Sequence, residues 1–511
     1  MEKGGQSTTD GDKPHYEPIR KSDGVTSAEK QLGELCRKTF LSLWSYPGVY
    51  RDEGKPQGRG HGKEICDLLV VFGEHIIIFS DKHCEFKNSG KPVIDWRRWF
   101  SRAIQQSAEQ AWGAERWIRQ NPAHIFLDRE CMRPLPIDLP NAENGRFHSV
   151  VVAHGISSRI QQEFGGSGSL MIDSALKGHK MHVRPFYVGD LDPGRTFVHV
   201  LDEDSLLTVM SARDTISDFA DYLVKRERLF RGPTAICTTG EEQLLAIYLS
   251  EVNKDGEHDF VLPLTPAQAL TNVFVPEGLW EDFRTSPERI GQLESDKISY
   301  MWDALIETFN LHALKGDQHF VTGGSIKSAE KILRFMAREP RLRRRTLSEI
   351  LAKMLETTGE NQRRVSGLCP AVTGDPHYVF VLLPMPKLPH VTYEQYREVR
   401  RHFLEHCCKV MKLKYPDAKD IIGIATEPRM RGAPGSEDAV YLDARAWTQN
   451  MENEARELQA TLGILTHPAE TLIHASEYPH IRRVEKKLKN YRNKPCPCGS
   501  GKKYKYCCLN K

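Results

Sequence analysis

The densest hydrophobic pattern of the chain lies between residues 62 and 86. Two apolar runs, 64–72 and 75–79, flank the short polar break Gly73-Glu74. β-branched residues dominate both runs, which favours buried strands over a helix. The pattern therefore predicts a buried hairpin, and the other elements of the N-terminal part are best placed around it.

Apolar residues recur at helical spacing over residues 27–44, and residues 46–51 have the pattern of a short strand. After the hairpin, a long helix is predicted over 96–120 and a buried strand over 147–153. The predicted order is helix, two or three strands, helix, strand. Such an order indicates an α/β domain.

The rest of the chain changes pattern twice. We expect strands within 186–201, helices over 203–229 and 240–249, and a mainly helical stretch over 276–358. A strand at 377–383, a helix at 392–413 and strands at 420–425 and 439–442 then predict a second, small α/β unit. With 511 residues, several domains are expected. Our division is a disordered N-terminus (1–27), a first α/β domain (28–190), an α-rich middle (191–370), the small α/β domain (371–475) and a basic tail (476–511).

Composition narrows the class of protein. Hydrophobic residues make up 39% and charged residues 27% of the chain, which is ordinary for a soluble globular protein. No apolar run approaches the roughly 18 residues of a membrane helix, and the polar N-terminus lacks a secretion signal. We therefore expect a cytoplasmic protein with no membrane insertion, whose 12 cysteines are reduced. Net charge is +3, but residues 481–511 hold eleven Lys/Arg and one acid, which predicts an anionic partner for the tail.

Polar residues interrupt the predicted hairpin. Asp67 lies in its first strand, and Ser80, Asp81 and Lys82 end its second. Charged groups at the ends of buried strands cost free energy unless they pair or hold a metal ion. Side chains alternate along a strand, so Ser80 and Lys82 are expected on one face and Asp81 on the other.

Residues 28–155 resemble the PD-(D/E)xK nuclease superfamily, on the element order and on Asp67 and Lys82. The resemblance implies a restriction-endonuclease-like αβββαβ core that cleaves phosphodiester bonds with Mg²⁺ or Mn²⁺. It assigns Asp67 as the first metal-binding acid, Lys82 as the catalytic lysine and Glu34 as the helix glutamate. Ser80 stands where the family has its second acid. Asp81, if a bulge re-aims it, or Glu64 is a replacement.

Two functions follow from this resemblance. The first is a metal-dependent nuclease acting on nucleic acid, DNA more than RNA, in defence or repair. The second is a non-catalytic adaptor with a degenerate nuclease fold, in which Asp67 and Lys82 form a buried ion pair. The run Arg343, Arg344 and Arg345 also suggests phosphate contacts, since arginine forks match phosphate oxygens. A solvated helix end is the alternative for these arginines.

The C-terminal tail carries four cysteines within thirteen residues, Cys496, Cys498, Cys507 and Cys508. Four thiolates suit a tetrahedral, structural Zn²⁺ and leave no open position for catalysis. So short a segment has no core, so metal binding would supply its folding energy. The tail closely resembles the SEC-C motif, with Cys508 where the translocase form has histidine. The resemblance implies a bacterial protein whose tail binds a chaperone, ribosome or other protein.

Overall fold

The predicted hairpin is confirmed as strands β2 (Lys63–Phe72) and β3 (His75–His83) of the computed structural model. The pair Phe72 and His75 closes it, and Gly73 in the turn has a φ of 56°, a left-handed conformation that favours glycine. The structure describes residues 16–24, 26–53, 61–141, 143–254, 257–261, 273–318, 325–369, 377–428, 436–466, 470–471, 473–478, 502, 503 and 506.

The hairpin lies at the centre of a five-stranded sheet with the order β1-β2-β3-β4-β7. β1 (Ser45–Arg51) and β2 are antiparallel, as are β2 and β3. β4 (Arg146–His154) and β7 (Val198–Asp202) then run parallel to β3. The carboxyl ends of β3, β4 and β7 therefore meet at one edge of the sheet.

Helices cover both faces of this sheet. One face packs against α1 (Ser27–Trp44), which begins with a capping box between Thr26 and Glu29, and against α5 (Glu203–Ala212) and α6 (Ile216–Phe230). The other face packs against α2 (Pro92–Phe100), the π-helical turn η2 (Ser101–Gln105) and α3 (Gln106–Gln120). The predicted αβββαβ order is therefore present, and the α/β fold class is confirmed.

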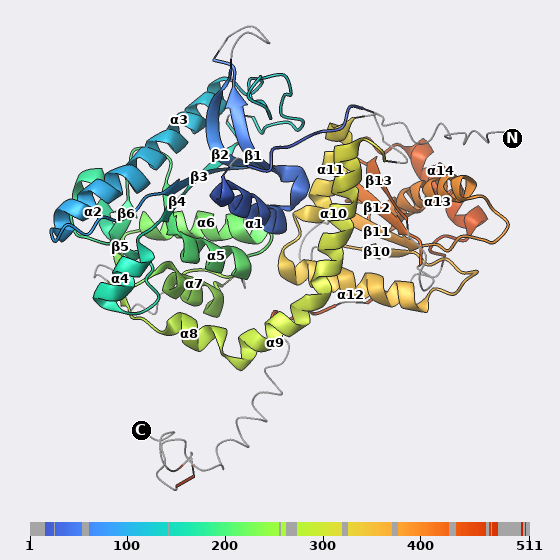
Figure 1. Ribbon diagram of the computed structural model, residues 1–511. Coiled ribbons are helices and arrows are strands. Elements are labelled where there is room, and N and C mark those ends of the chain that lie inside the picture. The colour runs from blue at the N-terminus through green and yellow to red at the C-terminus, as the bar shows by residue number, and fades with distance from the viewer. Residues whose placement is uncertain are drawn as a thin grey trace, which may run out of the picture.

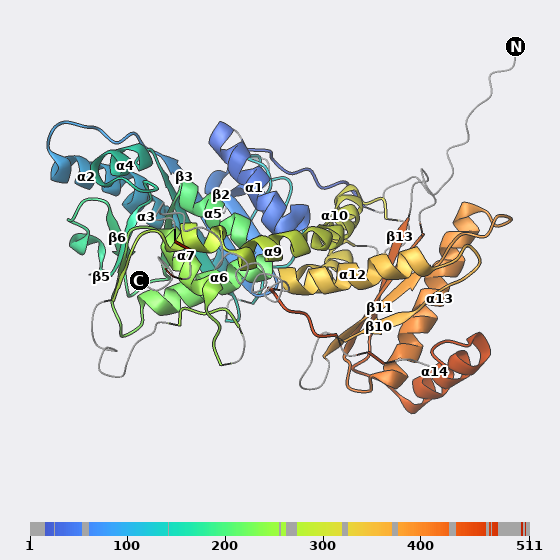
Figure 2. The same cartoon turned by 90° about the horizontal axis from the view of Figure 1, so that it is seen from below.

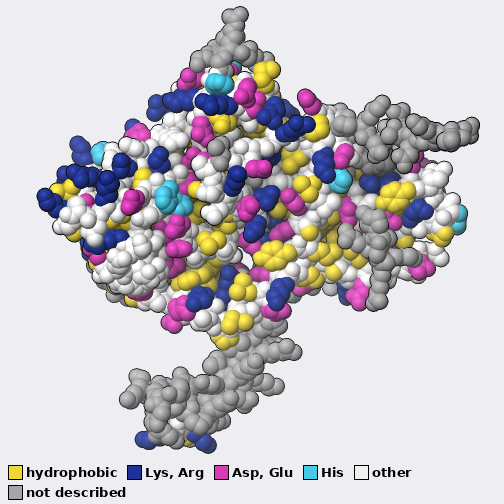
Figure 3. All heavy atoms as spheres, viewed as in Figure 1, with side chains coloured by type: hydrophobic (Ala, Val, Ile, Leu, Met, Phe, Trp, Pro, Cys, Tyr) yellow, Lys and Arg dark blue, Asp and Glu magenta, His cyan; other side chains and the backbone are white. Residues whose placement is uncertain are grey.

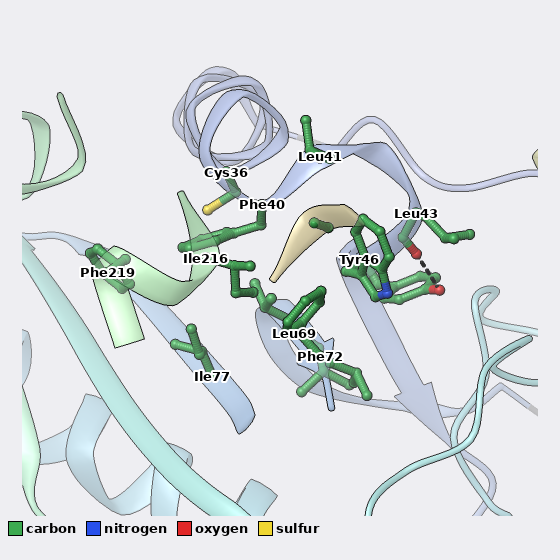
Figure 4. Packing of buried hydrophobic residues seen from close by; sticks show 14 of the residues in the cluster. Cys36, Phe40, Leu41, Leu43, Tyr46, Leu69, Phe72, Ile77, Ile216 and Phe219 are labelled. Carbon is green, nitrogen blue, oxygen red and sulfur yellow. Dashed lines mark hydrogen bonds between the residues drawn. The ribbon is translucent and has the colours of Figure 1, made fainter. Parts of the chain in front are cut away.

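The core between the sheet and α1 is aromatic and aliphatic (Figure 4). The Phe40 ring lies 6.1 Å from that of Phe79 and 5.3 Å from that of Phe219, which joins α1, β3 and α6. Tyr46 donates its hydroxyl hydrogen to the Leu43 carbonyl oxygen at 2.6 Å. The buried hydroxyl therefore has a partner, and the α1–β1 corner is fixed beside the hairpin.

A second sheet has the order β6-β5-β8-β9 and lies next to α2. Its strands are β5 (Met171–Lys177), β6 (Tyr187–Asp190), β8 (Ile236–Thr238) and β9 (Val273–Val275). The helices near it are α4 (Ser157–Phe164), α7 (Glu241–Ser250) and α8 (Leu279–Arg284). Of these strands, only β6 falls within a stretch for which the sequence predicted strands.

The predicted helical stretch is confirmed by α8, α9 (Pro287–Asp296), α10 (Tyr300–Lys315), α11 (Ile326–Ala337) and α12 (Arg341–Thr357). Helices α10, α11 and α12 lie between the first sheet and a third sheet (Figures 1 and 2). The third sheet has the order β10-β11-β12-β13 and confirms the small α/β unit. It comprises β10 (Ser366–Leu368), β11 (Tyr378–Pro384), β12 (Asp420–Thr426) and β13 (Glu437–Asp443), with α13 (Tyr393–Lys414) and α14 (Gln449–Leu462) beside it.

The N-terminal segment differs from its prediction of disorder over 1–27, although residues 1–15 lie outside the described residues. Residues 16–24 are described, and they cross to α10. Tyr16 donates to the Ala313 carbonyl oxygen at 2.5 Å, and the Ile19 amide donates to the Leu314 carbonyl oxygen at 2.8 Å. Backbone pairing and a partly buried ring order a segment whose composition is polar.

One buried hydrophobic cluster runs from α1 and the first sheet through α10–α12 to Phe380 and Ile422 of the third sheet. The domain boundaries therefore stay predictions, because the predicted domains share a core. Across the described residues, none of the helices combines the length and apolar character that a membrane crossing requires.

Candidate functional site

Asp67, Ser80 and Lys82 lie on one face of the first sheet. Leu68 pairs with Phe79, so the register continued by one residue places Asp67 opposite Ser80. Ser80 pairs with Val151 and Lys82 with Ala153, and directly paired residues share a face. Val151 and Ala153 belong to the cluster that packs on α2–α3. This face therefore carries the Asp67 carboxylate and the Lys82 ammonium group on neighbouring strands, with the neutral Ser80 between them.

Asp67 is a partly buried carboxylate at the start of the buried stretch of β2. Its Oδ2 accepts a hydrogen bond from the Asp81 backbone N–H at 2.6 Å. Burial is the main effect that raises the pKa of Asp67, to about 6, and the Asp81 and Glu29 carboxylates add to it. The N–H of Asp81 and the Lys82 ammonium oppose the rise. Asp67 is therefore ionised at neutral pH, but its partial burial makes the ionised form costly in free energy.

Lys82 is exposed, and no ion pair within 4 Å joins it to Asp67. The buried ion pair that the adaptor reading expected is therefore not formed between these two described side chains. Lys82 influences Asp67 only through a longer-range charge interaction. Its ammonium group is free to meet a solvent-borne anion.

Asp81 points to the opposite face, as the strand alternation predicts. There its Oδ1 lies 2.5 Å from Nε2 of His154, and Nδ1 of the same ring lies 2.5 Å from Oε2 of Glu203. His154 ends β4 and Glu203 begins α5, so three elements meet at this point. Burial lowers the pKa of His154, but bonding to the two carboxylates outweighs burial and raises it to about 9. The imidazole is therefore a cation at neutral pH.

Glu64 lies near Asp67, whereas Glu34 does not join it. A β-bulge interrupts the alternation of β2, because Val49 pairs with Cys66 but Tyr50 pairs with Glu64, so Glu64 shares the face of Asp67. Burial, together with Asp67 and Glu29, raises the pKa of Glu64 to about 7. Glu34 is exposed on α1. Among the described residues, no group of three or more His, Cys, Asp or Glu side chains is arranged to hold a metal ion.

The residues present therefore do not fit the magnesium or manganese ion that the nuclease resemblance implies. These ions prefer octahedral oxygen ligands and are usually held by carboxylates together with waters. Ser80 is neutral and only 1% exposed, Asp81 is engaged with His154, and no third acid, histidine or cysteine of the described residues joins Asp67 and Glu64.

The arginine run also differs from its predicted role in phosphate binding. Arg344 is 1% exposed and pairs with Asp303 at 2.7 Å, and Arg345 is 4% exposed and pairs with Asp296 at 3.2 Å. Arg343 is half-exposed near Glu339. Arg344 and Arg345 therefore hold α12 to neighbouring helices. Basic side chains gather instead over α2 and α3 (Figure 3), where Arg97, Arg98 and Arg102 are exposed.

Sequence reasoning missed His154 and Glu203. The available signal for His154 was that two parallel strands both end in polar side chains. β3 ends in Asp81-Lys82-His83, and β4 ends in His154. The helix of Glu203 lies far along the chain, and no spacing links it to Asp81.

The predicted zinc ligands Cys496, Cys498, Cys507 and Cys508 lie outside the described residues. Residues 492–510 match the family model of the SEC-C motif, which is compatible with a zinc-binding tail. No solved structure matches the chain.

Proposed function

We propose that this protein is a non-catalytic adaptor that docks to a partner through a zinc-bound C-terminal tail. The observation that carries the proposal is the position of Asp81. It is the nearest replacement for the missing second acid, yet it faces away from Asp67 and is engaged with His154 and Glu203. Because no group of three or more potential metal ligands is found among the described residues, the sheet is in this proposal a scaffold, not a metal-dependent hydrolase.

The tail supplies the binding function in this proposal. Cys496, Cys498, Cys507 and Cys508 hold Zn²⁺, which cross-links a segment too short to fold by itself. The surrounding lysines and arginines favour a partner with an acidic surface, and they raise the rate of encounter at low salt.

A metal-dependent nuclease is the second candidate. It is favoured by Asp67 and Lys82, which lie on one face of the sheet, and by the exposed Arg97, Arg98 and Arg102 on the helices that cover that face. This function requires Glu64 or another carboxylate to complete a metal site with Asp67 when nucleic acid binds.

One set of proteins separates the two candidates. Wild type, Asp67→Ala, Lys82→Ala and Cys496→Ser/Cys498→Ser are incubated with plasmid, linear and single-stranded DNA and with RNA, in Mg²⁺, Mn²⁺ or EDTA. The adaptor proposal expects no cutting by any of them, about one zinc per chain in the wild type, and capture of a partner that the double cysteine variant loses.

Matched controls are Asp282→Ala on the exposed side of α8 and Lys87→Ala in an exposed loop. Metal-dependent cutting that Asp67→Ala and Lys82→Ala lose, and the controls keep, would overturn the adaptor in favour of the nuclease. If the double cysteine variant loses zinc but still captures the partner, the tail is not the partner-binding element, and the proposal is also overturned.

A further inference from the structure

A charged cavity of about 330 Å³ lies between α6, α9 and the start of α12, away from the first sheet's polar ends. Its wall is completed by His258 and by Glu477, which belongs to the segment 473–478 that leads toward the basic tail. In Figure 2 this orange-red segment runs from the side of α14 toward α9. A cavity of this volume has the size of a small-ligand site.

Each carboxylate that lines the cavity lies within 4 Å of a basic side chain. Asp218 pairs with Arg213 at 2.7 Å, and Asp221 pairs with Lys225 at 2.8 Å. The remaining pairs are Asp214 with Arg341, Asp296 with Arg345, Glu257 with Lys225 and Glu477 with His258. Lys225 serves two of these carboxylates, so five basic side chains are the partners of six acidic ones.

Arg289 on α9 is the exception among the lining cations. It is only 6% exposed, and no carboxylate of the described residues lies within 4 Å of its guanidinium group. Its Nη1 donates a hydrogen bond to Oε1 of Gln292 at 2.6 Å. Burial is the main effect that lowers the pKa of Arg289, and the nearby Arg213 charge lowers it further. Tyr478, Asp296 and Glu477 act in the opposite direction and raise it. A buried guanidinium without a counter-ion costs free energy, which a bound anion would recover.

Gln292 connects Arg289 to the tail segment. The Oε1 of Gln292 accepts a hydrogen bond from Arg289, and its Nε2 donates one to Oε1 of Glu477 at 2.6 Å. The other carboxylate oxygen of Glu477, Oε2, lies 2.7 Å from Nε2 of His258. The neighbouring Tyr478 donates its hydroxyl hydrogen to the Leu249 carbonyl oxygen at 2.7 Å. An anion bound to Arg289 would therefore change the hydrogen bond between Gln292 and Glu477.

We propose that this cavity binds the phosphoryl group of a small metabolite on Arg289, and that its occupancy sets how firmly residues 476–478 are held at the root of the tail. The planar fork of arginine matches the oxygens of a phosphoryl group. Phosphate binding does not depend on the adaptor function. Only the regulatory consequence rests on that function.

The test uses the full-length protein and inorganic phosphate, titrated by calorimetry at constant ionic strength set with chloride. Arg289→Gln is expected to weaken phosphate binding at least tenfold. Arg284→Gln, an exposed arginine of α8 paired with Glu281, is the matched control and keeps wild-type binding. Equal binding by wild type and Arg289→Gln, or no binding by wild type, overturns the site.

Two further readouts separate ligand binding from a structural role and from tail control. Without phosphate, Arg289→Gln is expected to melt at the wild-type temperature or above it, because it removes an unpaired buried charge. A fall would show that Arg289 is structural. Phosphate should also slow amide hydrogen exchange at residues 476–478 in the wild type. Gln292→Ala should bind phosphate without this slowing, and slowing that persists in Gln292→Ala overturns the proposed link.

Discussion

The two faces of the first sheet carry different charged groups near the carboxyl end of β3. On the α1 face, Asp81, His154 and Glu203 form a line of opposite charges with two contacts of 2.5 Å. On the α2–α3 face, Asp67 has a backbone N–H as its partner, and Lys82 stands exposed. The first face is electrostatically satisfied and the second is not. This difference teaches that pairing offsets the cost of buried charge on one face, whereas the less complete pairing on the other face leaves Lys82 open to a ligand.

The largest expected effect is the loss of the histidine at the satisfied face. His154→Ala leaves Asp81, whose side chain is 5% exposed, without its cationic partner. We expect the free energy of unfolding to fall by about 3 kcal/mol, in urea denaturation at pH 7. His83→Ala is the control, because the His83 ring lies 5.8 Å from that of His154 but His83 is exposed. Equal losses in the two variants would contradict the proposed role of the Asp81–His154–Glu203 line.

The same cluster predicts a pH dependence. The pKa of His154 rises from 6.5 to about 9 on folding, so its stabilising effect is complete below about pH 6.5 and is lost as the pH rises through 9. Between pH 7 and pH 10, the wild type should therefore lose roughly 2 kcal/mol more stability than His154→Ala does. Parallel stability curves for the two proteins over this range would contradict the assignment.

The smallest effect has the opposite sign and belongs to the other face. Asp67→Asn keeps an oxygen that accepts from the Asp81 N–H but removes a carboxylate whose pKa is raised to about 6. A raised acid pKa means that the ionised form destabilises the fold above that pH, so the variant should gain about 1 kcal/mol at pH 8, after allowance for solvent screening. Thermal unfolding measures the change, with Asp282→Asn on α8 as the neutral control. A loss of stability would show that Asp67 is paired after all.

The buried arginines repeat the comparison elsewhere in the molecule. Arg344 and Arg345 have carboxylate partners on neighbouring helices, whereas Arg289 has the amide oxygen of Gln292. Partnered and unpartnered arginines look alike in the sequence, because the partners of Arg344 and Arg345 come from residues about forty to fifty positions away. The sequence therefore did not show that Arg344 and Arg345 are buried in ion pairs, and phosphate contact by Arg343 stays a prediction.

Local patterns determined much of the fold. The apolar runs around Gly73 predicted the β2–β3 hairpin, helical spacing predicted α1, and alternation predicted that Asp81 points away from Ser80 and Lys82. The cysteine spacing likewise predicted the SEC-C tail. Turns, strand faces and metal-ligand spacings are set by residues close together in the chain, so one sequence is enough to find them.

Tertiary structure alone decided which charges meet. It brought His154 and Glu203 to Asp81, buried Arg344 and Arg345, and left Arg289 facing a cavity beside Glu477. It also ordered residues 16–24 against α10. The energy of a buried charge depends on partners that folding brings from distant segments, and no local pattern records them.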